Sequence, residues 1–401
     1  MNVSSCHLCG SHELLTALDL GHHPLADLFL KDHQVHALER RYPLRLVRCA
    51  ACGHGMNSYV VPGEERYQEN DYSYDSANSR VSVQHFHDMA REVGERAGVA
   101  RGDLVVDLGS NVGTLLSAFL ARGAEVQGVD PAPNIARLAV ENGIPTINDF
   151  FGPSAADAVL ARGKAKVVTM TNAFNHVSDL HAFMGTLGRI LREDGTFVIE
   201  LPYYLDVLRK RHFDVIYLEH VSYVAVKPLV PFFARYGLRV THVEENDYMS
   251  GSIRFFVGKG VSDGSVAAQI DKEEAAGLYL ESTWDHFARQ VRDMKLRLVD
   301  ELIDARRGGG RIVAVGAAAK GNTLLNYCGI DRTLVDFATD ASPLKIGKWT
   351  PGSHLPIRSD EAIDGTVTHA LILAWNIAGL LKGKIGSRHP GLTFITPHVV
   401  E

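Results

Sequence analysis

The chain has 401 residues, of which 46% are hydrophobic and 22% charged, and its formal net charge is −6. This length suffices for two or three soluble domains, and the negative charge argues against sequence-independent binding to nucleic acid. The sequence has no apolar run of about 18 residues and no basic N-terminal segment followed by an apolar stretch, so we expect a cytoplasmic protein without a membrane span or signal peptide.

Four of the five cysteines form two pairs with the spacing of metal ligands. Two residues separate Cys6 from Cys9 and Cys49 from Cys52, and a glycine follows each pair. Two such pairs can close a tetrahedral Zn²⁺ site, and four sulfur ligands leave no open position for metal catalysis. Disulfide bonds are the alternative, which a cytoplasmic setting disfavours. We therefore predict a structural zinc ion in a module of residues 1–65.

Residues 66–260 alternate short apolar strands with helices, which predicts a doubly wound α/β domain. Within it, residues 105–133 read as a strand ending on Asp107, a glycine-containing loop, a helix and a second strand ending on Asp130. Such a loop lets the backbone approach a ligand, and the acid after the second strand is placed to hold ribose hydroxyls. The predicted nucleoside-cofactor site consists of Asp107, Gly109, Ser110, Asn111, Gly113, Asp130 and Pro131.

The identity of the cofactor follows from the form of this loop. It lacks the G-x-G-x-x-G of dinucleotide sites, and its D-x-G-x-x-x-G pattern resembles the first motif of class I S-adenosylmethionine (SAM) methyltransferases. The resemblance implies that the loop binds the methionine portion of SAM and Asp130 the ribose. It further implies that Asp149 and Phe150 meet the adenine, and that Asn172 and His176 face the cofactor.

A second α/β unit follows a long amphipathic helix. Apolar residues recur at helical spacing from Asp271 to Arg306, and we expect residues 261–401 to comprise this linker and a C-terminal α/β domain. Residues 311–330 predict a strand, a small-residue loop and a helix whose start could hold a phosphate, although a turn that only needs small residues would look the same. The residues predicted to form a second, nucleotide-sized pocket here are Gly316, Lys320, Asn322, Trp375 and Asn376.

Several segments together carry a resemblance that covers the chain. Besides the cysteine pairs, they are PLADLFL (24–30), NDYSYDSANS (70–79), YLEHVSY (217–223), GSIR (251–254) and GAAAKGNTLLNYCGI (316–330). They are similar to segments of the SAM-dependent deoxysugar C-methyltransferases that act on nucleotide-linked 4-keto-6-deoxy sugars. This implies an α/β fold with an N-terminal zinc-binding module, a central class I SAM methyltransferase domain of Rossmann-like fold, and a second, C-terminal Rossmann-like domain. One departure is Tyr-Met-Ser-Gly-Ser (248–252), where the family tends to have His-Gly-Gly-Ser.

The YLEHVSY segment matters because methylation of carbon needs a carbanion equivalent, which a neighbouring 4-keto group makes accessible. Histidine is a natural base near neutral pH. The resemblance assigns this role to His220, with Glu219 fixing its tautomer and raising its basicity, and with Tyr217 stabilising the enolate. It assigns Tyr72 or Tyr74 to the same site. Spacing alone favours a satisfied core histidine at position 220.

The predicted function is therefore SAM-dependent methylation, at C3 by the family's preference, of a dTDP- or GDP-linked 4-keto-6-deoxy sugar. Tyr223 and Arg254, from YLEHVSY and GSIR, are assigned to the substrate side. The alternatives are C5-methylation of such a sugar, O- or N-methylation of a small molecule, and a non-catalytic zinc-bearing protein that senses SAM. We expect a monomer.

Overall fold

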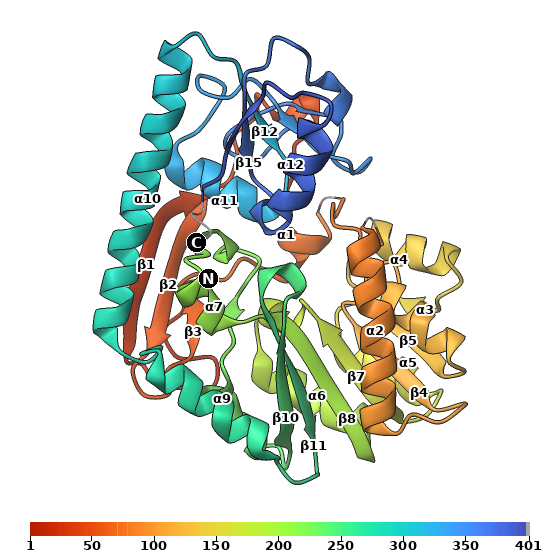
Figure 1. The fold of residues 1–401 in the computed structure, drawn as a ribbon. Coiled ribbons are helices and arrows are strands. Elements are labelled where there is room, and N and C mark those ends of the chain that lie inside the picture. Colours follow the sequence, from red (N-terminus) through yellow and green to blue (C-terminus); the bar gives the residue numbers. More distant parts are fainter. Residues whose placement is uncertain (70, 78, 398–401) are drawn as a thin grey trace.

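The computed structural model describes residues 1–69, 71–77 and 79–397, so the last four residues of the predicted C-terminal domain lie outside the described part. Three sheets form the framework of the molecule (Figure 1). In the described part of the chain, no helix is both long enough and apolar enough to cross a membrane.

The N-terminal sheet is antiparallel and includes a strand from the middle of the chain. Its order is β1-β2-β3-β9, formed by Leu14–His23, Tyr42–Cys49, Gly55–Asn57 and Ser222–Tyr223. In the last pairing, Gly55 lies opposite Tyr223 and Met56 opposite Ser222. Because β9 begins two residues after His220, the zinc-binding segment and the predicted catalytic loop are joined by backbone pairing.

The central sheet has seven strands in the order β10-β11-β8-β7-β4-β5-β6. All neighbours pair in parallel except β11, which is antiparallel to β8 and to β10. The chain leaves β4 toward β5 and β6 and then crosses to β7, so the strand order reverses beside β4, where open α/β sheets bind ligands. The strands are β4 (Leu104–Leu108), β5 (Glu125–Val129), β6 (Thr146–Ile147), β7 (Ala165–Thr171), β8 (Leu191–Pro202), β10 (Arg239–Asn246) and β11 (Ser252–Gly258).

Helices cover the central sheet. Buried apolar faces such as that of α2, with Phe86, Met89 and Val93, pack against the strands. The helices of this part are α1 (Gly63–Tyr67), α2 (Arg80–Ala97), α3 (Thr114–Ala121), α4 (Pro133–Glu141), α5 (Pro153–Leu160), α6 (Leu180–Ile190), α7 (Tyr204–Arg209), α8 (Val226–Ala234) and α9 (Gly264–Ala275).

The long helix α10 (Glu281–Arg307) runs along β1 of the N-terminal sheet and reaches the C-terminal domain (Figure 1). There a parallel sheet has the order β14-β13-β12-β15-β16, which again reverses beside its first strand. The strands are β12 (Ile312–Val315), β13 (Ala338–Thr339), β14 (Ile357–Arg358), β15 (His369–Ile372) and β16 (Thr393–Ile395), and the helices are α11 (Ala319–Cys328) and α12 (Ala378–Gly386).

Candidate active site

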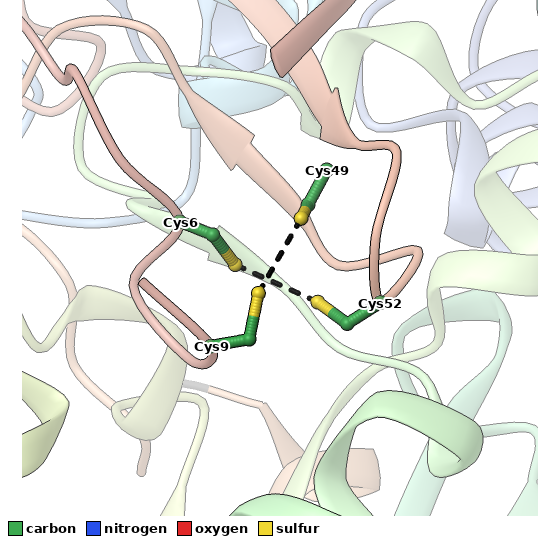
Figure 2. A group of neighbouring side chains, drawn as sticks. All are labelled: Cys6, Cys9, Cys49 and Cys52. Carbon is green, nitrogen blue, oxygen red and sulfur yellow. Dashed lines mark hydrogen bonds between the residues drawn. The ribbon is translucent and has the colours of Figure 1, made fainter. Parts of the chain in front are cut away.

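The four paired cysteines meet in one cluster (Figure 2). Cys6 and Cys9 come from the turn before β1, and Cys49 and Cys52 from the end of β2 and the turn after it. Their sulfur atoms all lie within 4.8 Å of one another, with 3.6 Å between Cys6 and Cys52 and 3.5 Å between Cys9 and Cys49. Tetrahedral Zn–S bonds of about 2.3 Å require sulfur atoms about 3.8 Å apart, so the cluster fits a zinc ion with four thiolate ligands.

The loop after β4 turns sharply beside β7. Gly109 has a left-handed backbone (φ +74°), and a Cβ there would lie 2.7 Å from the Cβ of Ala173. The N–H groups of Gly109 and Ser110 donate to the carbonyl of Val129 at 2.8 and 3.2 Å, which fastens the loop to the end of β5. Only a residue without a side chain fits this turn, as the sequence predicts.

Two buried carboxyl groups flank the loop. Asp130 accepts the N–H of Asn111 on Oδ2 and that of Ala132 on Oδ1, each at 2.9 Å, and burial raises its pKa to about 6. Asp107 accepts the hydroxyl of Thr169 at 2.7 Å, and burial raises its pKa to about 7. Each carboxylate oxygen of Asp130 keeps a second lone pair, so it can also accept a ligand hydroxyl.

A cavity of about 910 Å³ extends from this loop to the C-terminal domain. Gly113 is the N-cap of α3 and does not line it. The half-buried Asp149 lines the cavity and accepts the N–H of Phe150 at 2.8 Å. The other predicted cofactor residues that line the cavity are Asp107, Gly109, Ser110, Asn111, Asp130, Pro131, Phe150, Asn172 and His176.

Two buried polar atoms at the cofactor end have no hydrogen-bond partner among the described residues, the Oδ1 of Asn172 and the Oγ of Ser110. Asn172 also has a left-handed backbone (φ 51°), a conformation that non-glycine residues adopt at functional sites. Buried polar groups need partners. The methionine, ribose and adenine portions of SAM offer such partners, so the residues present fit this cofactor.

His176 is held in place by residues that no sequence motif indicated. The hydroxyl of Tyr67 hydrogen-bonds its Nδ1, and Nη1 of Arg66 donates to its carbonyl at 3.0 Å. The same Nη1 donates to the carbonyl of Glu219 at 3.2 Å. Burial, with a contribution from the neighbouring His220, lowers the pKa of His176 well below its usual range, so the ring is neutral. Arg66 thus fastens the cofactor side of the cavity to the loop that carries His220.

His220 lines the cavity as a neutral imidazole, with its ring centroid 5.0 Å from that of His176. Its Nδ1–H donates to the carbonyl of Val215 at 2.8 Å, because a carbonyl oxygen can only accept. This tautomer leaves a lone pair on Nε2, which can accept a proton. Burial lowers the pKa of His220 to about 3. The ring of Tyr217 lies 3.8 Å from that of His220, centroid to centroid.

The loop that carries Tyr217 and His220 is anchored to the N-terminal sheet by hydrogen bonds. Nδ2 of the buried Asn57, in β3, donates to the carbonyls of Tyr217 and His220 at 2.9 and 2.8 Å. The hydroxyl of Tyr223 donates to the Oδ1 of the same asparagine at 3.1 Å. Tyr223 therefore supports the loop and does not line the cavity, in contrast to its predicted place on the substrate side.

The expected role of Glu219 in fixing the tautomer of His220 and raising its basicity is wrong, since the carbonyl of Val215 accepts the Nδ1–H and burial lowers the pKa of His220 instead. Oε1 of Glu219 accepts the N–H of Asp27 at 2.9 Å, and its Oε2 is buried without a described partner. Burial, followed by the charge of Asp27, raises the pKa of Glu219 to about 7. The side chain of Asp27 lines the cavity, a feature that the PLADLFL segment contained and sequence reasoning did not single out.

Tyr72 and Tyr74 line the cavity, on the segment between α1 and α2. The hydroxyl of Ser73, between them, donates to the carbonyl of Asp27 at 3.4 Å. Burial raises the pKa of each of these two tyrosines well above its usual range, so both hydroxyls are protonated. They can donate a hydrogen bond to a developing negative charge.

The C-terminal domain contributes the far end of the cavity. Ala318, Ala319 and Lys320, at the start of α11, line it together with Asn376. The Nζ of Lys320 lies 4.3 Å from the ring centroid of Trp375, and burial lowers the pKa of this lysine to about 8.

Lys345 also lines this end, with its Nζ donating to the carbonyl of Ala317 at 2.7 Å and lying 3.6 Å from the carboxylate of Asp340. Sequence reasoning missed it, because it lies in a loop without a recognisable motif. Two ammonium groups and a helix N-terminus, offset in part by the carboxylate of Asp340, favour an anionic ligand at this end.

Four other predicted substrate residues hold the framework and do not line the cavity. Nδ2 of Asn322 donates to the carbonyl of Ala26 at 2.7 Å, which fastens α11 to the N-terminal segment. The indole of Trp375 donates to Asp214 at 2.5 Å and carries Lys320 on its face. The remaining two are Gly316, where a Cβ would lie 2.6 Å from that of Ala374, and Arg254, which pairs with Glu200, Glu92 and Glu244.

Three successive parts of the sequence match described domain families. Residues 6–67 match "Putative zinc binding domain", residues 70–243 match "Methyltransferase domain", and residues 248–397 match "C-methyltransferase C-terminal domain". With the cysteine cluster and the central sheet, these matches confirm the predicted fold class and the two predicted cofactors, SAM and a zinc ion bound by cysteines.

One curated relative spans nearly the whole chain. "C-methyltransferase NovU" of Streptomyces niveus is 32% identical over 382 residues, which cover 94% of this chain and 90% of the relative. "Ubiquinone biosynthesis O-methyltransferase" of Rhodopseudomonas palustris is 29% identical over 96 residues, covering 24% of this chain and 38% of the relative. Magnesium protoporphyrin IX methyltransferase from Synechocystis, solved with S-adenosylhomocysteine (SAH), has 13% identity and a TM-score of 0.36 over 45% of this chain and 88% of its own, a likeness too low to carry an argument.

Proposed function

The chain belongs to the SAM-dependent C-methyltransferases, and from this premise we propose that it methylates a carbon of a nucleotide-linked 4-keto-6-deoxy sugar. When bound, SAM supplies an electrophilic methyl group. The residues of the chain must therefore provide a nucleophilic carbon and hold it in place. A sugar carbon next to a ketone meets this need, because loss of its proton gives an enolate.

The proposed base is His220. Its Nε2 lone pair accepts the proton from the carbon, while Nδ1–H remains bound to the carbonyl of Val215. As the C–H bond breaks, negative charge moves to the ketone oxygen, and a tyrosine hydroxyl donates a hydrogen bond to it. Tyr217 is the first candidate because its ring packs against the imidazole, with Tyr72 and Tyr74 as further donors.

The nucleotide end of the substrate is proposed to bind at the C-terminal domain. Lys320 and Lys345 carry the positive charge expected for a diphosphate, and the N-terminus of α11 adds backbone N–H donors. The methyl donor would lie at the opposite end, over the loop that begins at Gly109. His220 lines the same cavity. The observation that carries the proposal is that the cofactor loop, His220 and the two lysines all line one cavity.

The test uses purified enzyme, SAM and matched pairs of 4-keto and 4-hydroxy nucleotide sugars, each linked to dTDP or to GDP. We expect methylation of a 4-keto sugar only, with a new carbon-bound methyl signal in the NMR spectrum of the product. Equal methylation of the 4-hydroxy analogue on oxygen would contradict the proposal. The position of the new methyl group distinguishes C3, which the family resemblance favours, from C5. A cytoplasmic location and a monomeric state complete the proposal.

A further inference from the structure

Two asparagine side chains bind the backbone of the segment that carries the cavity tyrosines. Nδ2 of Asn134 donates to the carbonyl of Tyr72 at 2.9 Å, and its Oδ1 accepts the N–H of the same residue at 3.1 Å. Nδ2 of Asn111 donates to the carbonyl of Tyr74 at 3.0 Å, and its Oδ1 accepts the N–H of Ser76 at 2.9 Å. Each carboxamide therefore donates one hydrogen bond to this backbone and accepts one from it, as the main chain of a paired β-strand does.

Asn111 contacts the carboxylate of Asp130 directly, and Asn134 is linked to it through Ala132, two residues earlier in the chain. This carboxylate accepts the N–H of Asn111 on one oxygen and that of Ala132 on the other. Ala132 is the N-cap of α4, and Asn134 lies in the first turn of that helix. A continuous path of hydrogen bonds and two residues of backbone therefore joins Asp130 to Tyr72 and Tyr74.

We propose that Asn111 and Asn134 are positioning residues that couple occupancy of the SAM site to the placement of the tyrosine segment, residues 71–77. A ligand hydroxyl bound by Asp130 orders the carboxylate, the two N–H groups it holds and the asparagines beside them. The tyrosine wall of the cavity is then fixed for the second substrate. The inference rests on the proposed function in one respect, since it takes Tyr72 and Tyr74 to face the sugar.

Coupling of this kind has a quantitative signature. Two sites linked through one element change each other's affinity by the same factor, commonly about 5- to 150-fold. SAH should tighten binding of a dTDP-linked 4-keto-6-deoxy sugar by the factor by which that sugar tightens binding of SAH. A purely structural clamp would hold the segment equally well with and without SAH, and would give no such factor.

The first experiment is amide hydrogen exchange on the full chain with and without SAH. The N–H groups of Tyr72 and Ser76 report directly, because each donates to one of the two asparagines. We expect SAH to slow exchange of both by about fivefold or more. Unchanged exchange at both amides would overturn the inference, whether or not any sugar is a substrate.

The second experiment compares variants of α4. Asn134→Ala removes both bonds to Tyr72, and Asn134→Asp keeps the acceptor for its N–H and loses the donor to its carbonyl. Glu141→Ala is the matched control, since this exposed residue at the end of α4 pairs with Arg137 on the same helix and does not line the cavity. We expect Asn134→Ala to lose the SAH-dependent slowing at Tyr72 and to lower kcat about tenfold with a KM for SAM raised less than that. Asn134→Asp should lie between, and Glu141→Ala should match the unaltered enzyme.

Wild-type coupling and kcat in Asn134→Ala would overturn the inference. If Asn134→Ala does not fold, the inference is tested by Asn134→Asp and by amide hydrogen exchange of the unaltered enzyme with and without SAH. Absence of methyl transfer to every 4-keto sugar, with SAH still slowing the two amides, would reject the proposed function and leave the coupling of cofactor site and segment in place.

Discussion

The Nδ1–H of His220 donates to the backbone carbonyl of Val215 at 2.8 Å, and this one bond fixes which nitrogen of the ring carries the proton. A base must present a lone pair, and Nε2 does so because Nδ1 holds the proton. The partner is a main-chain group, so no side-chain substitution at position 215 removes it.

His220→Ala should slow turnover by roughly 10²–10⁴-fold because it removes the proposed base. The same variant should lose exchange of the substrate's α-hydrogen with deuterated water, measured by NMR without SAM. Tyr217→Phe, the comparison variant, should affect exchange less if the phenol only stabilises the enolate. Wild-type exchange in His220→Ala would transfer the role of base to Tyr72, Tyr74 or Tyr217.

Asp130→Ala should weaken SAH binding by roughly 1–3 kcal/mol, since buried hydrogen bonds are lost. The ionised carboxylate is the better acceptor, and its pKa of about 6 means that affinity of the unaltered enzyme should fall as the pH drops below 6. Calorimetry at pH 8 and pH 5 measures both effects. The control is Asp157→Ala, an exposed carboxylate of α5 outside the cavity. Unchanged affinity in Asp130→Ala would remove this residue from the cofactor site.

Lys320→Met should raise the KM for the nucleotide sugar about tenfold or more, because a charge-assisted hydrogen bond is lost while the side chain still packs on Trp375. The affinity for SAH should not change, since the lysine lies at the other end of the cavity. Steady-state kinetics and calorimetry separate these quantities. Lys384→Met, on α12 and outside the cavity, is the matched control. If neither Lys320→Met nor Lys384→Met changes the KM for the nucleotide sugar, the diphosphate does not bind at Lys320.

Cys49→Ser should reduce the zinc content from about one ion per chain and destabilise the fold, since a thiolate ligand is lost. Metal analysis and thermal unfolding measure the two effects. Cys328→Ala is the control, because this cysteine is buried in α11 and does not belong to the cluster. It should retain the zinc ion. Full stability of protein prepared without metal would contradict a structural role.

Buried histidines should make the protein less stable in mild acid. Burial lowers the pKa of His23 to about 4 and that of His220 to about 3, whereas an unfolded histidine titrates near about 6.5. Below pH 6.5 the unfolded state binds more protons, so the free energy of unfolding falls, by about 2 kcal/mol for each residue between pH 7 and pH 5. In urea unfolding experiments, the free energy of unfolding of His220→Gln should fall less between pH 7 and pH 5 than that of the unaltered protein. An equal loss in both proteins would mean that His220 is not held neutral.

The cofactor loop could be predicted from sequence because its signals are local. Asp107, Gly109 and Asp130 lie within one strand–loop–helix–strand unit, and short-range geometry sets their places. Asn322 and Trp375 carry no such signal, since their roles depend on partners far away in the chain. Asn322 pairs with Ala26 across 296 residues, and no local pattern distinguishes that contact from a phosphate ligand.

The role of Glu219 illustrates a second limit. Adjacency to His220 in sequence suggested contact, but the carboxylate points to Asp27 of the N-terminal segment. Neighbouring side chains in an irregular loop often diverge, and only the fold shows which backbone carbonyl lies within reach of the ring. Lys345 was missed for a related reason, since a single lysine in a Pro- and Gly-containing loop is most often a solvated surface residue.

Asn57 has a consequence for attempts to recombine members of this family. It belongs to the segment next to the cysteines, yet its amide supports the carbonyls of Tyr217 and His220, and β3 pairs with β9 directly after them. In a chimaera that takes its first 65 residues from one relative and the remainder from another, the N-terminal module of one protein would have to support the catalytic loop of the other. Such hybrids should bind SAH normally and still turn over slowly, and transplanting residues 217–223 together with the N-terminal module should restore the rate.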